Sequence, residues 1–219
     1  NTAVGYAAMN DNTEGISNIA IGHDTLSNNT TGSQNTAVGR QAMFSNTTAS
    51  DNTAVGNAAM NSNTTGTTNT AMGYLTLYSN TTAQQNTAVG NQSMRYNTTG
   101  GYNTALGQAA LHTNTTGAGN TSIGQNSMYS TTTGGLNTVV GYSAMFNNTT
   151  SGGNVAVGYN ALNATTTNGN LTAVGYETLQ SNTGNTQSTA VGYRALKLNT
   201  TGTENTAVGS HSMDANTTG

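Results

Sequence analysis

The whole chain is built from one 17-residue repeat in tandem, without insertion or deletion. Twelve full repeats and a thirteenth of 15 residues account for all 219 residues. Counted from its first Asn, the repeat reads N-T-A-V-G-x-x-A-(L/M)-x-x-N-T-T-G-x-x. Such fixed-period similarity is the signature of a solenoid, in which each repeat buries its apolar side chains by stacking on its neighbours. We expect a single repeat domain over 1–219, with repeats starting at 1, 18, 35, 52, 69, 86, 103, 120, 137, 154, 171, 188 and 205.

The length of the repeat selects the type of solenoid. Helical arrays use about 33 residues or more per repeat, so 17 residues are too few for a pair of helices. The T-A-V stretch is β-prone, and the Asn and Gly residues around it favour turns. The sequence therefore predicts an all-β fold, a parallel β-solenoid of 13 coils with one 17-residue repeat per coil.

Composition excludes an ordinary globular domain. Charged residues make up 5% of the chain and apolar residues 33%, against about 25% and about 45–50% in typical domains. Low charge and low hydrophobicity also occur in disordered chains, but here Gly returns at position 5 of every repeat. A fixed register of this kind favours an ordered stack. Because the chain has no Cys, stacking rather than disulfides must stabilise it.

Two columns of large apolar residues are the predicted core. Position 4 of the repeat is always Val, Ile, Leu or Met, and position 9 is always Leu or Met. All eight Met residues fall in these two columns, which favours apolar packing over a metal or redox role. The representative core residues are Val4, Met9, Val38, Met43, Val55, Met60, Val89 and Met94.

Position 3 is Ala in most repeats and lies next to the apolar position 4. Because successive side chains of a strand point to opposite faces, one of the two must face inward and the other outward. A constrained, uncharged outward face predicts a second surface packed against it. With only two large apolar residues per coil, the interior also looks thin. Identical chains are therefore the expected partners, in a homotrimer or a filament.

Three other columns carry structural predictions. The glycines of position 5, represented by Gly5, Gly22, Gly39 and Gly56, are expected at a positive φ angle or where a second backbone passes closely. Asn at position 12 and Thr at position 13 can form hydrogen-bonded ladders from coil to coil; a ligand or ice contact is the alternative. The N-T-T sequence is also a formal N-glycosylation acceptor.

Tyrosine recurs at position 6. An exposed aromatic column could bind sugars or another fibre, or could simply cover the strand edges. The candidate surface-binding aromatics are Tyr6, Tyr74, Tyr142, Tyr159, Tyr176 and Tyr193.

The sequence contains no constellation that predicts catalysis. A nucleophile needs a base within reach and a group that orients the base, but His23, His112 and His211 lie at different repeat positions. Apart from Asp11 and Glu14, the acidic residues are spread singly along the chain. We therefore expect no enzyme activity, no metal site and no cofactor.

Charge and hydropathy also exclude some partners. The net charge is −3 and the four basic residues are scattered, which argues against nucleic acid. No run of about 18 apolar residues could insert into a membrane. The chain starts and ends within the repeat pattern, so we expect it to be a segment of a longer polypeptide.

The N-T-A-V-G-x-x-A-(L/M) run resembles the repeat of YadA-like trimeric autotransporter heads. With its N-T-T-G segment, it is similar to the N-T-A-V-G-Y-x-A-L-x-x-N-T-T-G repeats of bacterial and phage tail-fibre-domain proteins. The resemblance covers the whole chain. The autotransporter likeness implies a left-handed parallel β-roll with three chains around one axis, displayed outside the cell for adhesion.

We therefore expect a structural component of an extracellular fibre, at the cell surface or on a virion, with an adhesive surface for a glycan or a receptor. Two alternatives remain open. One is an ice-binding solenoid that uses the Thr residues of positions 13 and 14, although adjacent residues do not easily point to one face. The other is a filament whose subunits join end to end through unpaired strands.

Overall fold

The computed structural model describes residues 1–184 and 187–218, which divide into two compact units, Asn1–Ala109 and Ala110–Gly219. The described residues contain strands and turns and no helix. In both units the strands are parallel and recur once per repeat. The predicted fold class, an all-β parallel β-solenoid, is confirmed, whereas the single domain over 1–219 stays a prediction.

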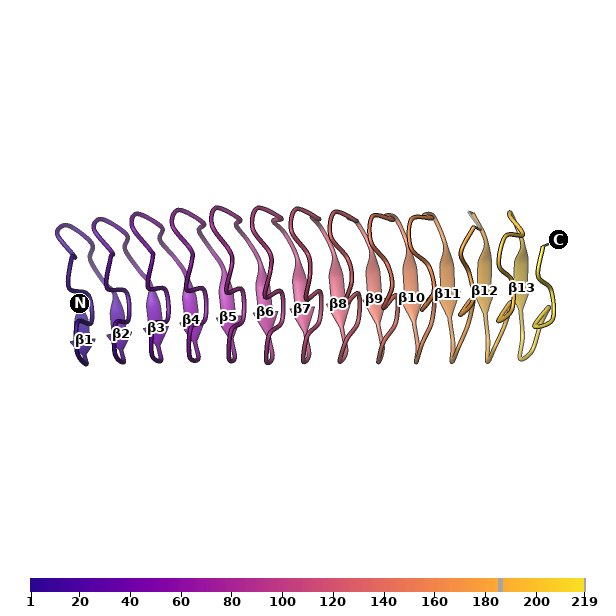
Figure 1. Cartoon of the computed structure of the whole chain (residues 1–219), viewed down its shortest axis with the longest axis horizontal. Helices are drawn as coiled ribbons and strands as arrows, with labels where there is room; N and C mark the ends of the chain where they lie inside the picture. Colours follow the sequence, from indigo (N-terminus) through magenta and orange to yellow (C-terminus); the bar gives the residue numbers. More distant parts are fainter. Residues whose placement is uncertain (185–186, 219) are drawn as a thin grey trace. The chain divides into compact units, whose positions relative to one another are not determined.

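The first unit contains seven strands of three residues each, and each strand pairs in parallel with the next one along the chain. Paired residues are one repeat apart, as in Ala54 with Ala71. The strands of this unit lie side by side in Figure 1. They are β1 (Thr2–Val4), β2 (Ile19–Ile21), β3 (Thr36–Val38), β4 (Thr53–Val55), β5 (Thr70–Met72), β6 (Thr87–Val89) and β7 (Thr104–Leu106).

The second unit repeats this arrangement with six strands, again paired in parallel in sequence order. The register is the same, as in Ala156 with Ala173. Like residues are therefore stacked on like residues within each unit. The strands are β8 (Thr121–Ile123), β9 (Thr138–Val140), β10 (Val155–Val157), β11 (Thr172–Val174), β12 (Thr189–Val191) and β13 (Thr206–Val208).

The strands turn their small residue inward, which corrects the core prediction for position 4. Ala54 is fully buried, whereas its neighbour Val55 is only half-buried. A 17-residue coil is narrow, and because Leu or Met of position 9 already fills its interior, the strand contributes only a small side chain there. The other predicted core residues of position 4 that lie outward are Val4, Val38 and Val89.

Position 9 supplies the large core side chains, as predicted. Met43, Met60 and Met94 are fully buried, and Met9 in the first coil is half-buried. Position 8, next to it, is buried as well, as in Ala59. Strand alternation does not apply here, because the residues of positions 7 and 9 have left-handed backbone angles, with φ of 51° at Met60. The backbone therefore turns both neighbours inward.

Two columns made up mostly of buried Asn link neighbouring coils. At position 12, the Asn46 side-chain amide donates to the Asn29 Oδ1 at 2.7 Å and to the Ala49 carbonyl at 3.1 Å. At position 1, the Asn35 side-chain amide donates to the same Ala49 carbonyl at 2.8 Å, and its backbone N–H donates to the Asn18 Oδ1. The predicted Asn ladder is confirmed at position 12, and position 1 adds a second one.

The buried ladder accounts for the recurrence of the N-T-T sequence. In eight of the nine N-T-T sequons the Asn side chain lies inside the coil, so the folded chain does not expose it to a glycosyltransferase. The sequon residues with no exposed surface are Asn29, Asn46, Asn63, Asn80, Asn97, Asn114, Asn148 and Asn199.

The N-T-T-G segment forms a turn whose N–H groups converge on one acceptor. The carbonyl of Thr47 accepts from the backbone N–H groups of Thr30, Thr31 and Gly32 at 2.9, 3.2 and 3.4 Å. The Thr30 hydroxyl donates to the same carbonyl at 3.0 Å. Successive N–H groups in a turn form a concave site for a negative atom. Here the next coil supplies that atom, so the Thr hydroxyls of position 13 form the ladder predicted from the sequence.

The glycines of position 5 combine both properties predicted for them. Gly56 has a φ of 140°, and a Cβ atom added to it would lie 2.3 Å from the carbonyl oxygen of Gly73 in the next coil. A side chain is therefore excluded by the backbone angle and by the neighbouring coil. The predicted turn glycines Gly5, Gly22 and Gly39 share this geometry.

Candidate functional site

The first candidate surface is the outward face of the strands, formed by positions 2 and 4 of the repeat, which we call the strand band. In the first unit, Thr53 and Val55 of β4 are half-buried on either side of the buried Ala54. Larger side chains protrude further, with Met72 and Leu106 each 44% exposed. No Asp, Glu, Lys or Arg occurs at positions 1 to 5 of any repeat. Each unit therefore presents an uncharged band of hydroxyl and methyl groups.

The second candidate surface is the tyrosine column of position 6 in the second unit. Tyr142, Tyr159, Tyr176 and Tyr193 stack on one another, with ring centroids 5.0 to 5.5 Å apart. Each ring is 40–46% exposed. Because neighbouring rings cover each other's faces, they present edges and hydroxyl groups outward. Sugars pack on open ring faces, so this geometry does not favour the sugar-binding interpretation.

In the first unit the predicted tyrosines are more isolated. Tyr6 is 75% exposed and stacks on His23 at 5.1 Å, and Tyr74 is 49% exposed. A shorter aromatic column also occurs at position 10 of the second unit, where Tyr129 stacks between His112 and Phe146 at 4.7 and 5.1 Å.

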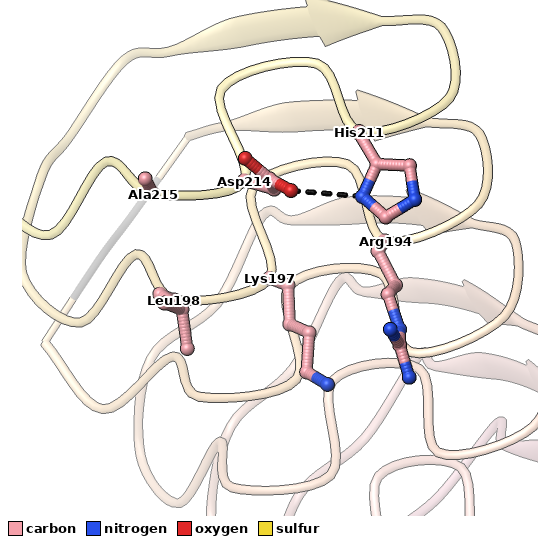
Figure 2. A pocket seen from close by; sticks show the side chains of 6 residues that line it. All are labelled: Arg194, Lys197, Leu198, His211, Asp214 and Ala215. Atoms are coloured by element: carbon pink, nitrogen blue, oxygen red, sulfur yellow. Dashed lines mark hydrogen bonds and ion pairs between the residues drawn. The ribbon is translucent and has the colours of Figure 1, made fainter.

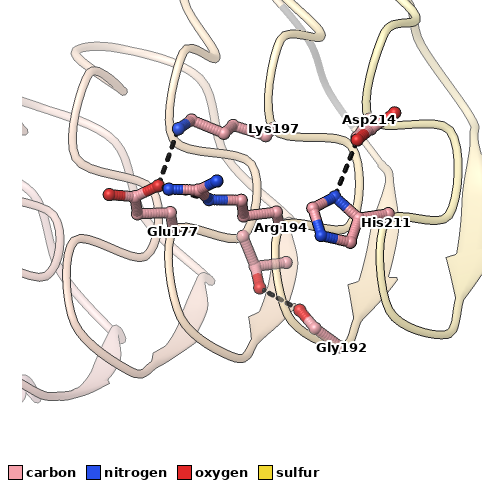
Figure 3. Close-up of polar contacts among 7 residues, drawn as sticks. Glu177, Gly192, Arg194, Lys197, His211 and Asp214 are labelled. Atoms are coloured by element: carbon pink, nitrogen blue, oxygen red, sulfur yellow. Dashed lines mark hydrogen bonds and ion pairs between the residues drawn. The ribbon is translucent and has the colours of Figure 1, made fainter.

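A cluster of charged side chains lies on the last repeats of the second unit. The Arg194 Nε and the Lys197 Nζ both contact the Glu177 Oε2, at 2.9 and 2.7 Å. His211 contacts Asp214 at 2.8 Å. Figure 3 shows the two basic side chains converging on the single carboxylate. Both cations are therefore paired with a carboxylate of the protein itself.

The cluster changes the protonation of two groups. The hydrogen bond from Lys197 and the contacts with Arg194 lower the pKa of the Glu177 carboxyl, although partial burial opposes them. Partial burial and the nearby Glu177 raise the pKa of the Tyr176 hydroxyl. Both shifts favour an ionised Glu177 and a neutral Tyr176 around neutral pH.

A shallow pocket of about 200 Å³ lies beside this cluster. Figure 2 shows Arg194, Lys197, His211 and Asp214 on its rim, with the His211–Asp214 contact across it. The basic groups already contact Glu177, and the two aliphatic residues Leu198 and Ala215 complete the lining. The pocket is an edge of the ion-pair cluster and not a separate array of reactive groups.

The sequence analysis missed this cluster, although its signal is present in the repeat. Glu177, Arg194 and His211 are each 17 residues apart, at position 7 of successive repeats. In-register stacking therefore places them in one column. The linear order of the charges does not reveal this column, because the acidic residues are far apart along the chain.

The histidines remain in separate places, as expected from their repeat positions. His23 pairs with Asp24 at 2.9 Å, His112 stacks on Tyr129, and His211 pairs with Asp214. Within residues 1–184 and 187–218, no three His, Cys, Asp or Glu side chains are grouped so that they could hold a metal ion.

The part of the chain that the structure describes contains no helix with the length and apolar character needed to cross a bilayer. Comparisons of the chain with protein-family models, curated proteins and solved structures gave no match.

Proposed function

We propose that this chain is a structural component of an extracellular fibre, carried at a cell surface or on a virion. The observation that supports this role most directly is the pair of buried Asn ladders. In the first unit the links of the position 12 ladder are of one kind, with side-chain amide nitrogen to side-chain oxygen distances of 2.7 to 3.1 Å. Repeated bonds of one kind allow such an array to be extended coil by coil without a change of design.

The interior of each coil supports a scaffold role. Many of its side chains are apolar, such as Met60 and Ala54, or are hydrogen-bonded amides, such as Asn63. Buried polar groups stabilise a fold only when they are hydrogen-bonded. Stability is thus distributed along the array.

Identical chains are the proposed partners, as a homotrimer or a filament. Each coil fills its own interior, so a thin core is not the reason to expect a second chain. The exposed tyrosine column of the second unit supports association instead, as the aromatic centre of a larger contact, because aromatic side chains are enriched at protein interfaces. Tyr159 and Tyr176 at the centre of this column are 42% and 40% exposed. Adhesion to a receptor belongs to the same proposal, whereas the stacked rings do not favour a glycan as the ligand of the column.

We propose no enzymatic role. The charged contacts of the described residues are a pair of cations on Glu177 and the His23–Asp24 and His211–Asp214 contacts. Binding to nucleic acid is not proposed either, since the net charge is −3.

The test is the mass of the purified chain in solution, combined with electron microscopy. A homotrimer would have three times the chain mass of 22.1 kDa. The double variant Tyr159→Ser, Tyr176→Ser should dissociate the assembly. The control is Tyr102→Ser, which removes a tyrosine that is 60% exposed but lies outside the column. A chain that stays monomeric at high concentration and forms no fibres would refute the proposal.

A further inference from the structure

The strand band has a composition that its place in the fold does not require. Every residue of position 2 is Thr, Ile or Val, and every residue of position 4 except Met72 and Leu106 is Val or Ile. The solvent-facing positions 6, 7, 10, 11, 14 and 17 accept charged residues in several repeats. Outward strand positions commonly carry polar or charged side chains too. Uncharged, β-branched residues at all but two of these positions therefore point to a surface with a specific partner.

Geometry makes the band a regular two-dimensional array. Strands pair in register, so Thr53 lies beside Thr36 and Thr70, and Val55 beside Val38. Neighbouring strands are about 4.8 Å apart, and alternate residues of one strand about 6.6 Å apart. Because β-branched side chains have restricted χ1 rotation, the hydroxyl and methyl groups hold nearly fixed positions. The band therefore presents a rigid lattice of alternating hydroxyl and methyl columns, except at Ile19, Met72, Leu106 and Val155.

The size of the band argues against a protein partner. Seven strands at about 4.8 Å, each presenting two side chains, give the first unit a band on the order of 300 Å². A stable protein interface takes about 800 Å² from each partner. The six strands of the second unit provide a smaller area than the seven strands of the first, so the summed area of the two bands is also below this value. A second copy seated on the band alone would bind weakly.

We infer that the strand band binds ice. Methyl groups restrict the orientation of the water molecules in contact with them, and Thr hydroxyls can both donate to and accept from the same waters. Oxygen rows in hexagonal ice repeat at a spacing close to that between β-strands. A rigid array with this period can hold surface waters in ice-like positions, whereas a charged side chain would disrupt them.

This surface differs from the Thr columns of the N-T-T-G turn. The Thr64 hydroxyl of position 13 donates to the Thr81 carbonyl at 3.0 Å and is part of the internal ladder. Thr65 of position 14 is exposed but follows Thr64 directly in a turn. The ice contact is therefore assigned to alternate residues of the strands.

The experiment compares ice growth in the presence of the wild type, Thr53→Lys and Thr65→Lys, each checked for folding by circular dichroism. The wild type should shape ice crystals, delay their growth below the melting point and inhibit recrystallisation. Thr53→Lys should lose this activity several-fold, because it places a long charged side chain in the band. Thr65→Lys should retain it. A second variant, Thr53→Ser, keeps the hydroxyl, removes one methyl group and should lose part of the activity.

Three outcomes would overturn the inference. One is a wild-type protein that leaves ice growth unchanged. Another is an equal loss of activity in Thr53→Lys and Thr65→Lys. The third is an oligomer that Thr53→Lys dissociates, since the band would then be covered by a second copy. The fibre proposal is tested separately by the tyrosine variants, so the two can fail independently.

Discussion

The side-chain amide of Asn46 donates a 2.7 Å hydrogen bond to the side-chain oxygen of Asn29, its counterpart one repeat earlier. Both residues are completely buried. An amide has donors and an acceptor, so one Asn can serve the coil on each side of it. In-register stacking is thereby favoured over any shifted register, in which buried amides would lose their partners.

Replacing Asn46 with Ala should lower the free energy of unfolding by about 3 kcal/mol, because it leaves buried groups of the neighbouring coils without a partner. Urea unfolding followed by circular dichroism measures the effect. The matched control is Asn57→Ala, at an exposed position of the next repeat, which should change the transition little. Equal shifts for the two variants would contradict a role for the ladder.

One substitution should strengthen the Asn ladder of position 12. Thr165 occupies position 12 in place of Asn, and its buried hydroxyl has no hydrogen-bond partner. Thr165→Asn should raise the free energy of unfolding by about 1 kcal/mol, since the other coils show that the site accommodates an amide. Thermal unfolding provides the measurement. A lower melting temperature would show that this coil has adapted to Thr.

Truncating a side chain should reduce the free energy of unfolding more at an inward position than at an outward one. Met60→Ala should cost about 2–5 kcal/mol, because it leaves a cavity in the coil interior. Val55→Ala should cost less than about 1 kcal/mol, since Val55 is only half-buried. The comparison tests whether position 9, and not position 4, supplies the large core side chains, and a larger effect at Val55 would assign position 4 to the core.

Gly56→Ala should destabilise the fold by about 3 kcal/mol or more, because φ is 140° and the new Cβ would meet the Gly73 carbonyl. Gly101→Ala is the control, because its φ lies outside the left-handed region and an added Cβ would lie 3.0 Å from the nearest atom, the Gln84 carbonyl oxygen. Position 16 already holds Ala118 in the next repeat, so Gly101→Ala should cost less than about 1 kcal/mol. Similar costs at both sites would rule out the backbone angle as the cause.

The ion-pair cluster should make a small, pH-dependent contribution to the free energy of unfolding. Because the pKa of Glu177 is lowered in the folded chain, its carboxylate stabilises the fold above the ordinary glutamate pKa. This contribution disappears as the pH falls through the lowered value. Glu177→Gln should therefore reduce stability near neutral pH by about 1 kcal/mol or less, and match the wild type in acid.

Unfolding curves at several pH values check this prediction, with Glu204→Gln at an exposed site as the control. High salt should shrink the difference between wild type and Glu177→Gln. A difference that persists unchanged at acid pH would assign the effect to packing rather than to charge.

The sequence by itself determined the type of fold and the register. An unbroken 17-residue period requires like residues to stack on like, which predicted the Thr ladder, the Asn ladder of position 12 and the glycines of position 5. The same period contained the column of Glu177, Arg194 and His211, because residues one repeat apart must be neighbours in the stack.

Only the tertiary structure decided which residues face inward. Alternation along T-A-V allows either Ala54 or Val55 to be the core residue, and hydrophobicity alone favours Val55. The available volume decides otherwise, because Met60 already fills the narrow coil and leaves room only for Ala54. The left-handed angles beside Met60, which turn Ala59 inward as well, depend on closing the coil. A repeat pattern fixes what stacks on what, whereas the closed path of the backbone fixes which side chains share the interior.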